Sequence, residues 1–396
     1  MKDTRNMTMD ELRAYRVGLC RDAVAFHKPD RTPHMSFYIT WPVTDAGYKL
    51  SEALHNWDVM EDAIVQHQQK YNFDVIQCLG TRNPCKISEA LGSQRYKIND
   101  EAGIISVQDS APFAHEDLRR LADDPVRAQW EIMMPHKFPL FRPGVGVEPF
   151  NQALHEQREY FSYVGRINRR MTTEFGVPAA SDGALGFASP GVEALFGFMR
   201  GIKGFAYDMR KDPELVKAAA DALDRMTLDP CFDLIEKAPE GPNEAVCFDF
   251  MLLSLAHTIM SNRQFEFFLW PKLKKLIDLL IAKGKTVRVY FHGALDRFYE
   301  YFQDYPKGSL IFMVEANSLW DVRERLPNVA LCGGLTTLMM GTASAEECVR
   351  QTKRLIDELG ADGGLVLSLN TMGSFPTDTK AENLRAVSEF IQTYEG

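Results

Sequence analysis

The chain of 396 residues is 45% apolar and 25% charged, a composition that is typical of a globular protein and excludes a mostly disordered chain. A formal net charge of −9, without any run of lysine and arginine, argues against sequence-independent nucleic-acid binding. No apolar run reaches the ~18 residues of a membrane span, and the first residues lack the apolar core of a secretory signal, so we expect a cytoplasmic protein.

Eight short apolar segments predict strands that are buried on both faces. In chain order they cover residues 34–41, 73–80, 177–187, 245–252, 286–293, 309–316, 328–334 and 364–370. Helical patterns separate the later segments. The clearest covers 344–360, where Ser344 can cap the first turn and Gly360 ends the helix. Residues 261–284 predict a short helix joined at Pro271 to a second one, because proline fits the first turn of a new helix.

The alternation of strands and helices predicts an α/β fold, a parallel (β/α)₈ or TIM barrel. We expect residues 1–396 to form one domain, in which the first thirty residues add a helical extension packed outside the barrel. A typical barrel needs ~250 residues, and most of the surplus falls in an insertion of about 93–176, after the second strand. Residues 135–150 are rich in proline, glycine and aromatics, which is poor material for regular elements. This stretch can be interpreted as a lid or rim of the barrel or as a plain loop, and the sequence does not decide between the two.

The seven cysteines are odd in number and scattered, and no two form a CxxC pair. This pattern predicts reduced thiols rather than a disulfide framework, and it excludes a zinc ribbon. The partner is therefore expected to be a small molecule or another protein.

Polar residues recur where the predicted strands end, and barrel active sites are built at the carboxyl ends of the strands. The later strands contribute Asp249, His292, Glu315, Cys332 and Asn370. The first three contribute Tyr38, Thr40, Gln77, Thr81, Arg82 and Asp182. A buried acid without partners costs several kcal/mol, so polar residues gathered at one end predict a functional site.

Each of these residues also has a structural interpretation. His292 is the main catalytic candidate because Gly293 leaves room for a ligand, although a hydrogen-bonded structural histidine is the alternative. Asp249 and Glu315 are candidates to assist it. Asp249 could instead cap the following turn, and Glu315 could be an exposed loop acid. Cys332 could be a small core residue, since no adjacent motif would lower its pKa.

Substrate contacts are expected from residues of several strand ends. These are Tyr38, Gln77, Arg82, Asp182, Phe248 and Asn370. Arg82 is a candidate clamp for a carboxylate or phosphate, with a solvated surface position as the alternative. The aromatic side chains suit a flat apolar substrate and would equally suit a packed core. The glycine-rich stretch 183–191 lacks the lysine and the spacing of a phosphate-binding loop.

Five sequence blocks, in order and spacing, resemble the uroporphyrinogen decarboxylase superfamily. They cover residues 183–216, 248–250 ("FDF"), 260–293, 331–349 and 367–387. The similarity extends over roughly 180–390 and, more weakly, over 30–92. The resemblance implies a (β/α)₈ barrel, and the superfamily divides into decarboxylases and corrinoid-dependent methyltransferases.

The decarboxylase branch holds its acidic substrate with arginines after the first strand and an aspartate after the second. Here the stretch after Pro33 reads "HMSFYITWPVTDAG" without arginine, and the second strand exits as "CLGTRNP" without aspartate. An acidic protein without these clamps is poorly suited to a multiply charged tetrapyrrole. Porphyrin synthesis is therefore disfavoured, and arginines lining the pocket would restore it as the better interpretation.

The thiol methyltransferases of the superfamily bind zinc through a His-x-Cys after the fifth strand and a cysteine after the eighth. His292 matches the histidine, but Ala294 and about Met372 stand where the cysteines would be. A cysteine-rich zinc site is therefore not expected. A harder set with Glu315, Asp249 or Cys332 beside His292 is the remaining way to bind zinc.

The remaining branch resembles the O-demethylase methyltransferases of anaerobes, which pass a methyl group to the Co(I) corrinoid (cobalamin) of a partner protein. The resemblance implies a small methyl donor, such as a methoxyaromatic compound, and a corrinoid-protein partner; a homodimer is one possible assembly. His292, or a metal that it binds, would neutralise the leaving oxygen, with Asp249 or Glu315 holding the imidazole. Decarboxylation of a carboxylated ring and a silent barrel that docks a corrinoid protein are the two alternatives.

Overall fold

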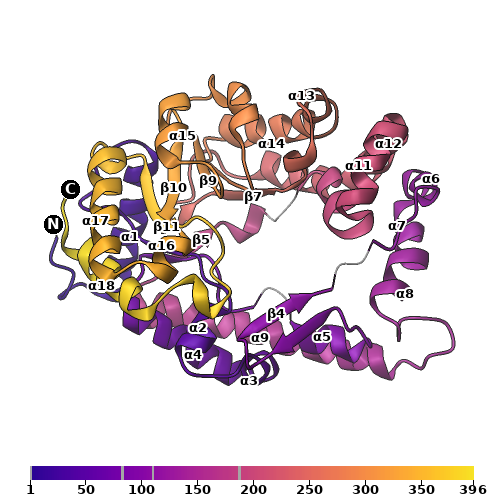
Figure 1. Cartoon of the computed structure of the whole chain (residues 1–396), viewed down its shortest axis with the longest axis horizontal. Coiled ribbons are helices and arrows are strands. Elements are labelled where there is room, and N and C mark those ends of the chain that lie inside the picture. The colour runs from indigo at the N-terminus through magenta and orange to yellow at the C-terminus, as the bar shows by residue number, and fades with distance from the viewer. Residues whose placement is uncertain (1, 82–83, 109–110, 186–188) are drawn as a thin grey trace.

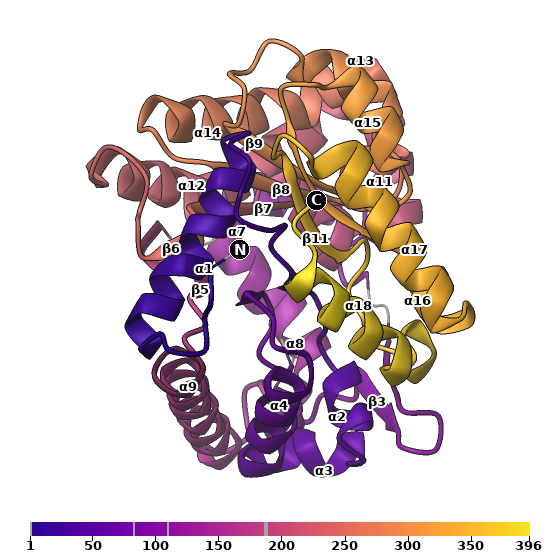
Figure 2. The same cartoon turned by 90° about the vertical axis from the view of Figure 1, so that its left-hand side faces the viewer.

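The computed structural model describes residues 2–81, 84–108, 111–185 and 189–396. Eight strand positions, all paired in parallel, make up the barrel. Helices lie on the outer side of the strands (Figures 1 and 2). The strands are β1 (Met35–Ser36), β2 (Val75–Ile76), β5 (Ala179–Ser181), β6 (Val246–Phe248) continued by β7 (Phe250–Ser254), β8 (Val287–Phe291), β9 (Leu310–Val314), β10 (Ala330–Leu335) and β11 (Leu365–Leu369).

The pairing of these strands follows the order of a barrel. One parallel sheet runs in the order β11-β10-β9-β8-β7, β5 pairs with β6, and β1 pairs with β2. Single bridges from His34 to Leu367 and from Tyr38 to Gly373 join β1 to β11. β2 and β5 are in contact, although the described residues form no ladder between them. The predicted (β/α)₈ barrel is confirmed, and all eight predicted strand positions are occupied.

Buried side chains on both faces explain the continuous apolar runs. Every residue of β8, β9 and β11 is buried, because one side of each strand faces the barrel interior and the other faces helices. In β8 the alternate residues Arg288 and Tyr290 point inward, and His292 continues that row. Phe291 points outward, where its ring contacts those of Phe302 and Phe312.

The two helices singled out in the sequence form as expected. α17 (Ala345–Leu355) is capped by Ser344, whose hydroxyl accepts a hydrogen bond from the amide of Glu347, and a π-helical turn extends it to Gly360. Residues 262–269 form a short helix, α13 (Asn262–Gln264), and a π-helical turn. α14 (Trp270–Ala282) follows, with Pro271 in its first turn.

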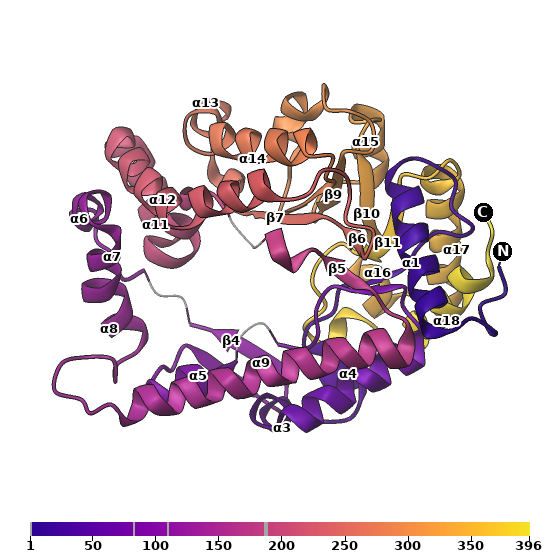
Figure 3. The same cartoon turned by 180° about the vertical axis from the view of Figure 1, so that it is seen from behind.

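The insertion after the second strand has regular elements on both sides of residues 138–147, which form no helix or strand, as their composition predicts. It holds the antiparallel strands β3 (Tyr96–Asn99) and β4 (Ile104–Val107), the short helices α6 (Asp117–Asp123), α7 (Pro125–Ala128) and α8 (Met134–Lys137), and the long helix α9 (Glu148–Phe175). Figure 3 shows α9 running past α4 and α5. Its buried stripe includes Tyr163, Ile167 and Met171, and Gly176 ends it in a left-handed conformation. The helix follows from an apolar stripe with helical spacing.

Helix α1 (Met9–Val24) contacts β6, β10 and β11 and covers the amino-terminal end of the barrel. The amide of Gly364, just before β11, donates to the carbonyl of Ala23 at 2.5 Å. The expected helical extension is thus present and closes the end opposite to the predicted site. The remaining helices are α2 (Trp41–Asp45), α3 (Leu50–His55), α4 (Trp57–Tyr71), α5 (Cys85–Ala90), α10 (Gly191–Ala194), α11 (Gly201–Lys211), α12 (Pro213–Lys237), α15 (Leu319–Arg325), α16 (Thr337–Thr342) and α18 (Ala381–Thr393).

All seven cysteines lie in the described part of the chain, where they are buried and form no disulfide. Among the described residues, no helix combines the length and the apolar character needed to span a membrane.

Candidate functional site

His292 and Glu315 form a polar pair directly after β8 and β9. Imidazole Nδ1 lies 3.5 Å from Glu315 Oε2, and both side chains are 29% exposed. The amide of Gly293 donates to Glu315 Oε2 at 2.8 Å, and the hydroxyl of Tyr290 donates to Oε1 at 3.5 Å. The amide of His292 is fixed by the carbonyl of Ser254 at 3.0 Å. The pair is therefore held at the carboxyl end of the barrel and stays partly exposed.

The electrostatics of the pair suit proton transfer. Interaction with His292 lowers the pKa of Glu315, with the amide of Gly293 adding to this, against the opposing effect of burial. The ionised carboxylate orients Nδ1 of the imidazole. The other ring nitrogen, Nε2, has no hydrogen-bond partner within the described residues and is free to exchange a proton with a ligand.

Gly293 explains why the strand ends in His-Gly. Its φ of +64° is a conformation that residues with a side chain rarely adopt, and a Cβ there would lie 3.0 Å from Cγ2 of Thr258. The left-handed turn points the amide of Gly293 at the carboxylate of Glu315. The glycine thus fixes the partner of the histidine.

A second polar cluster, which the sequence did not reveal, lies behind His292. Glu193 of α10 accepts hydrogen bonds from the Ser254 hydroxyl at 3.0 Å, the Leu255 amide at 3.0 Å and the Ala256 amide at 2.9 Å. The Ser254 hydroxyl also lies 2.9 Å from Nδ1 of His257. The sequence predicts that the fourth strand ends at residue 252, whereas β7 continues to Ser254.

Burial dominates the titration of this cluster. It raises the pKa of Glu193 to about 7, although the three donors favour the ionised form. Burial also lowers the pKa of His257 to about 4, and the charge of His292 adds to this. The charge of His292 acts on both residues, so this cluster lies within electrostatic reach of the catalytic candidate.

Asp249 is not part of this site, and its expected position at a carboxyl end is wrong. The residue interrupts the fourth strand between β6 and β7, and its carboxylate accepts from the amides of Asn243 at 2.7 Å and Thr286 at 2.9 Å. Arg21 of α1 pairs with it at 3.2 Å. Thr286 precedes β8 whereas His292 follows it, so about 20 Å of strand separate the two residues. Asp249 thus ties α1 to the amino end of the barrel.

The proposed metal ligands do not assemble into a site. Cys332 lies within β10 and is 0% exposed, and burial raises the pKa of its thiol to about 12 against the nearby cation of Arg288. Among the described residues, no three His, Cys, Asp or Glu side chains are placed to share an ion. His292 and Glu315 lie together without Cys332. The three predicted zinc ligands therefore do not fit a shared zinc ion.

Two predicted substrate residues serve the structure. Tyr38 points out of the barrel, where its hydroxyl lies 3.1 Å from Oγ1 of Thr379 and its ring contacts Trp41 and His67. The expectation that it lines the substrate pocket is therefore wrong. Asn370 does lie at the carboxyl end of β11. Its Oδ1 accepts from the amide of Gly334 at 2.6 Å and so holds the end of β10.

The other predicted substrate residues lie in three different places. Gln77 and Phe248 both contact Arg288 in the barrel interior. Asp182 follows β5 and accepts from Nδ2 of Asn243 at 2.8 Å, which turns its carboxylate toward the loop before β6. Arg82 lies outside the described residues. Of the predicted substrate residues that the structure describes, only Gln77 therefore combines an interior position with partial exposure.

Arg288 is an interior residue that the predicted strand ends do not reveal. It is the second residue of β8 and is 0% exposed, and its side chain crosses the interior to reach Met35 on β1. A charged residue inside the apolar run "VRVYF" was the available signal, because a buried strand seldom carries an arginine without a purpose.

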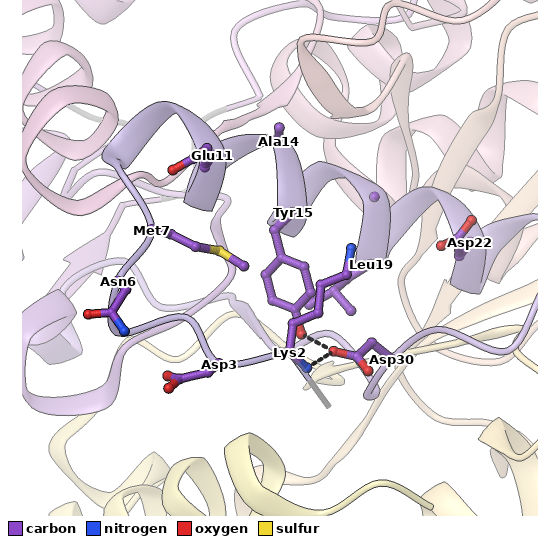
Figure 4. Close-up of a pocket in the computed structure, with 11 residues that line it drawn as sticks. Lys2, Asp3, Asn6, Met7, Glu11, Ala14, Tyr15, Leu19, Asp22 and Asp30 are labelled. Atoms are coloured by element: carbon purple, nitrogen blue, oxygen red, sulfur yellow. Dashed lines mark hydrogen bonds between the residues drawn. The ribbon is translucent and has the colours of Figure 1, made fainter.

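A separate cavity of about 610 Å³ lies beside α1 and the amino-terminal segment (Figure 4). The side chain of Asp30 there accepts hydrogen bonds from the Tyr15 hydroxyl at 2.8 Å and the Lys2 amide at 2.6 Å. No strand end of the barrel lines this cavity. It is therefore distinct from the site at His292.

The family described as Uroporphyrinogen decarboxylase (URO-D) matches residues 163–394, more than half of the chain. The chain belongs to this family. The matched region of the uroporphyrinogen decarboxylase family contains β5 to β11 and both residues of the His292–Glu315 pair.

Among curated proteins, none matches the chain significantly. A solved methyltransferase from Methanosarcina mazei is similar in fold, with a TM-score of 0.60 and 15% identity. The similarity covers 98% of this chain and 99% of that one. The uroporphyrinogen decarboxylase family and its barrel are thus established, and the resemblance seen in the sequence is confirmed.

Proposed function

We propose that this member of the uroporphyrinogen decarboxylase family is a methyltransferase that moves a methyl group from a small donor to the Co(I) corrinoid of a partner protein. The observation that carries the proposal is the His292–Glu315 pair, in which a partly exposed imidazole lies beside a carboxylate at the carboxyl end of the barrel. The fold shared with a methyltransferase of known structure supports it.

The chemistry requires an acid because an ether oxygen is a poor leaving group. As the bond between methyl carbon and oxygen breaks, its electron pair stays on the oxygen, and Nε2 of His292 delivers the proton that the oxygen then needs. The carboxylate of Glu315 stabilises the imidazolium before the transfer and keeps Nδ1 oriented. The corrinoid is the second substrate, and it supplies the electron pair of the new cobalt–carbon bond.

The direct test is to mix the purified protein anaerobically with Co(I) cobalamin and a panel of methoxyarenes and methylamines. Appearance of the methyl-Co(III) absorbance with at least one donor is the expected result. If the protein binds a corrinoid protein but no donor yields methyl-Co(III), the barrel is a docking module and the proposal is wrong.

Decarboxylation of a carboxylated ring is the second candidate, and Arg288 is the observation that favours it. An arginine in the barrel interior suits an acidic substrate, although a single guanidinium is a weak match for a substrate with many carboxylates. Incubation with reduced uroporphyrinogen, followed by chromatography of the oxidised products, separates the two functions. Loss of carboxyl groups from the ring would favour the decarboxylase over the methyltransferase.

A further inference from the structure

Arg288 carries a buried charge for which the described residues provide no carboxylate. Its Nη1 donates to the sulfur of Met35 at 3.0 Å, and its Nη2 donates to Oε1 of Gln77 and lies 3.5 Å from the hydroxyl of Ser181. Nε is buried and has no hydrogen-bond partner among the described residues. The guanidinium carbon lies 4.3 Å from the ring centroid of Phe248.

These contacts leave the guanidinium poorly compensated. A thioether is a weak acceptor and an amide oxygen is neutral, whereas an arginine stays protonated in proteins. A buried charge without an opposite partner costs several kcal/mol. Arg31 shows the contrast, since this buried arginine meets both oxygens of Asp74 at 2.6 and 2.7 Å. An anion is the missing partner of Arg288.

A cavity of about 340 Å³ at the side of the barrel ends at two residues that contact Arg288. It lies between β2, β5 and α9, where the described strands form no ladder, and Gln77 and Ser181 line it. Both residues also contact Arg288, so they form the partition between the cavity and the guanidinium. The other lining side chains are largely apolar, among them Ile76, Leu79, Val164 and Met171.

We propose that this cavity binds a small organic carboxylate whose two oxygens pair with Arg288 after the side chain of Gln77 moves aside. A planar guanidinium binds a carboxylate through two parallel hydrogen bonds, and Nε, which lacks a partner, supplies one of them. The apolar wall suits an aromatic or branched aliphatic body, and the volume lies at the small end of ligand pockets. The inference concerns binding and does not depend on methyl transfer.

The test measures binding of benzoate and 3-methoxybenzoate against benzamide and anisole by isothermal titration calorimetry. The wild-type protein is expected to bind the acids at least about tenfold more tightly than the neutral analogues. Arg288→Met should remove that preference, and Arg354→Met, on the exposed face of α17, should keep it. Gln77→Ala should strengthen acid binding, because the competing amide oxygen is gone.

Arg288→Met should fold, since replacing a buried unpaired charge by an apolar side chain of similar length is neutral or stabilising. Should it fail to fold, Arg288→Lys keeps the charge without the planar fork and is expected to weaken acid binding. Equal affinity of the wild-type protein for acids and neutral analogues, no binding of either, or an unchanged acid preference in the folded Arg288 variant would each overturn the inference.

Discussion

Replacing Asp249 by alanine removes the carboxylate that joins three segments at the amino end of the barrel. The lost contacts are two backbone amides, of Asn243 and Thr286, the hydroxyl of Thr286 at 2.9 Å, and the guanidinium of Arg21. Each buried amide left without an acceptor costs about 1–3 kcal/mol, and breaking a buried ion pair costs about 3–5 kcal/mol. These costs overlap, and Arg21 is 19% exposed, so we expect a loss of about 4 kcal/mol.

Urea unfolding followed by circular dichroism measures this loss, with the exposed Asp22→Ala as the matched control. The control should change the free energy of unfolding by less than about 0.5 kcal/mol. The activity of the folded fraction of Asp249→Ala should stay near that of the wild type, because Asp249 lies at the opposite end from His292. A loss below about 1 kcal/mol, or a folded variant without activity, would refute this role of Asp249.

The same residue predicts a pH dependence. Burial would raise the pKa of Asp249, but hydrogen bonds from Thr286 and Asn243 and the charge of Arg21 outweigh it and lower the pKa. An acid whose pKa is lower in the folded state stabilises the fold above the unfolded-state pKa, and that stability is lost as the pH falls. Asp249→Ala should therefore lose less stability on acidification than the wild type does.

Three further changes have defined outcomes. Glu315→Gln should lower kcat at least about tenfold, because it removes the charge beside His292. The melting temperature should stay unchanged, because the new side chain keeps an acceptor for the amide of Gly293. A variant that turns over at the wild-type rate in steady-state assays would count against the pair. As the pH drops below about 6.5, each histidine whose pKa is lowered by burial should reduce the free energy of unfolding by up to about 1.4 kcal/mol per pH unit. The raised pKa of Glu193 partly offsets this loss. Burial lowers the pKa of three histidines in this way. These are His34 (about 4), His67 (about 3) and His257 (about 4). Equal urea midpoints at pH 7 and pH 5 would contradict that balance. Gly364→Ala should lower the melting temperature and reduce the free energy of unfolding by about 1–3 kcal/mol. The reason is that φ is +78° and the new Cβ would lie 2.5 Å from Cε1 of Phe26. Calorimetry that shows no shift would argue against this contact.

The strands could be predicted because burial on both faces leaves continuous apolar runs. The same property hides which residues face inward, since alternation of apolar and polar residues is what normally marks the inner face. Met35 and Phe37 point into the barrel, so the neighbouring Tyr38 points out. The sequence does not indicate which of the two alternating sets of residues faces the interior.

Position along a strand predicts some residues of the site, but it does not predict which side chains meet across the barrel. His292 and Glu315 were found because each follows the end of a strand, where parallel neighbours meet. Asp249 was misplaced because a polar residue can interrupt a strand as well as end it. Arg288 was missed because a long side chain in mid-strand reaches the opposite wall, which spacing along the chain does not show.

The central claim, that His292 supplies the proton in methyl transfer, is tested most directly by single-turnover kinetics with Co(I) cobalamin and an active methoxyarene. We predict that His292→Gln forms methyl-Co(III) about 10²–10⁴ times more slowly than the wild type, while its circular dichroism spectrum and donor affinity are unchanged. A folded His292→Gln variant that reacts at the wild-type rate would contradict the claim.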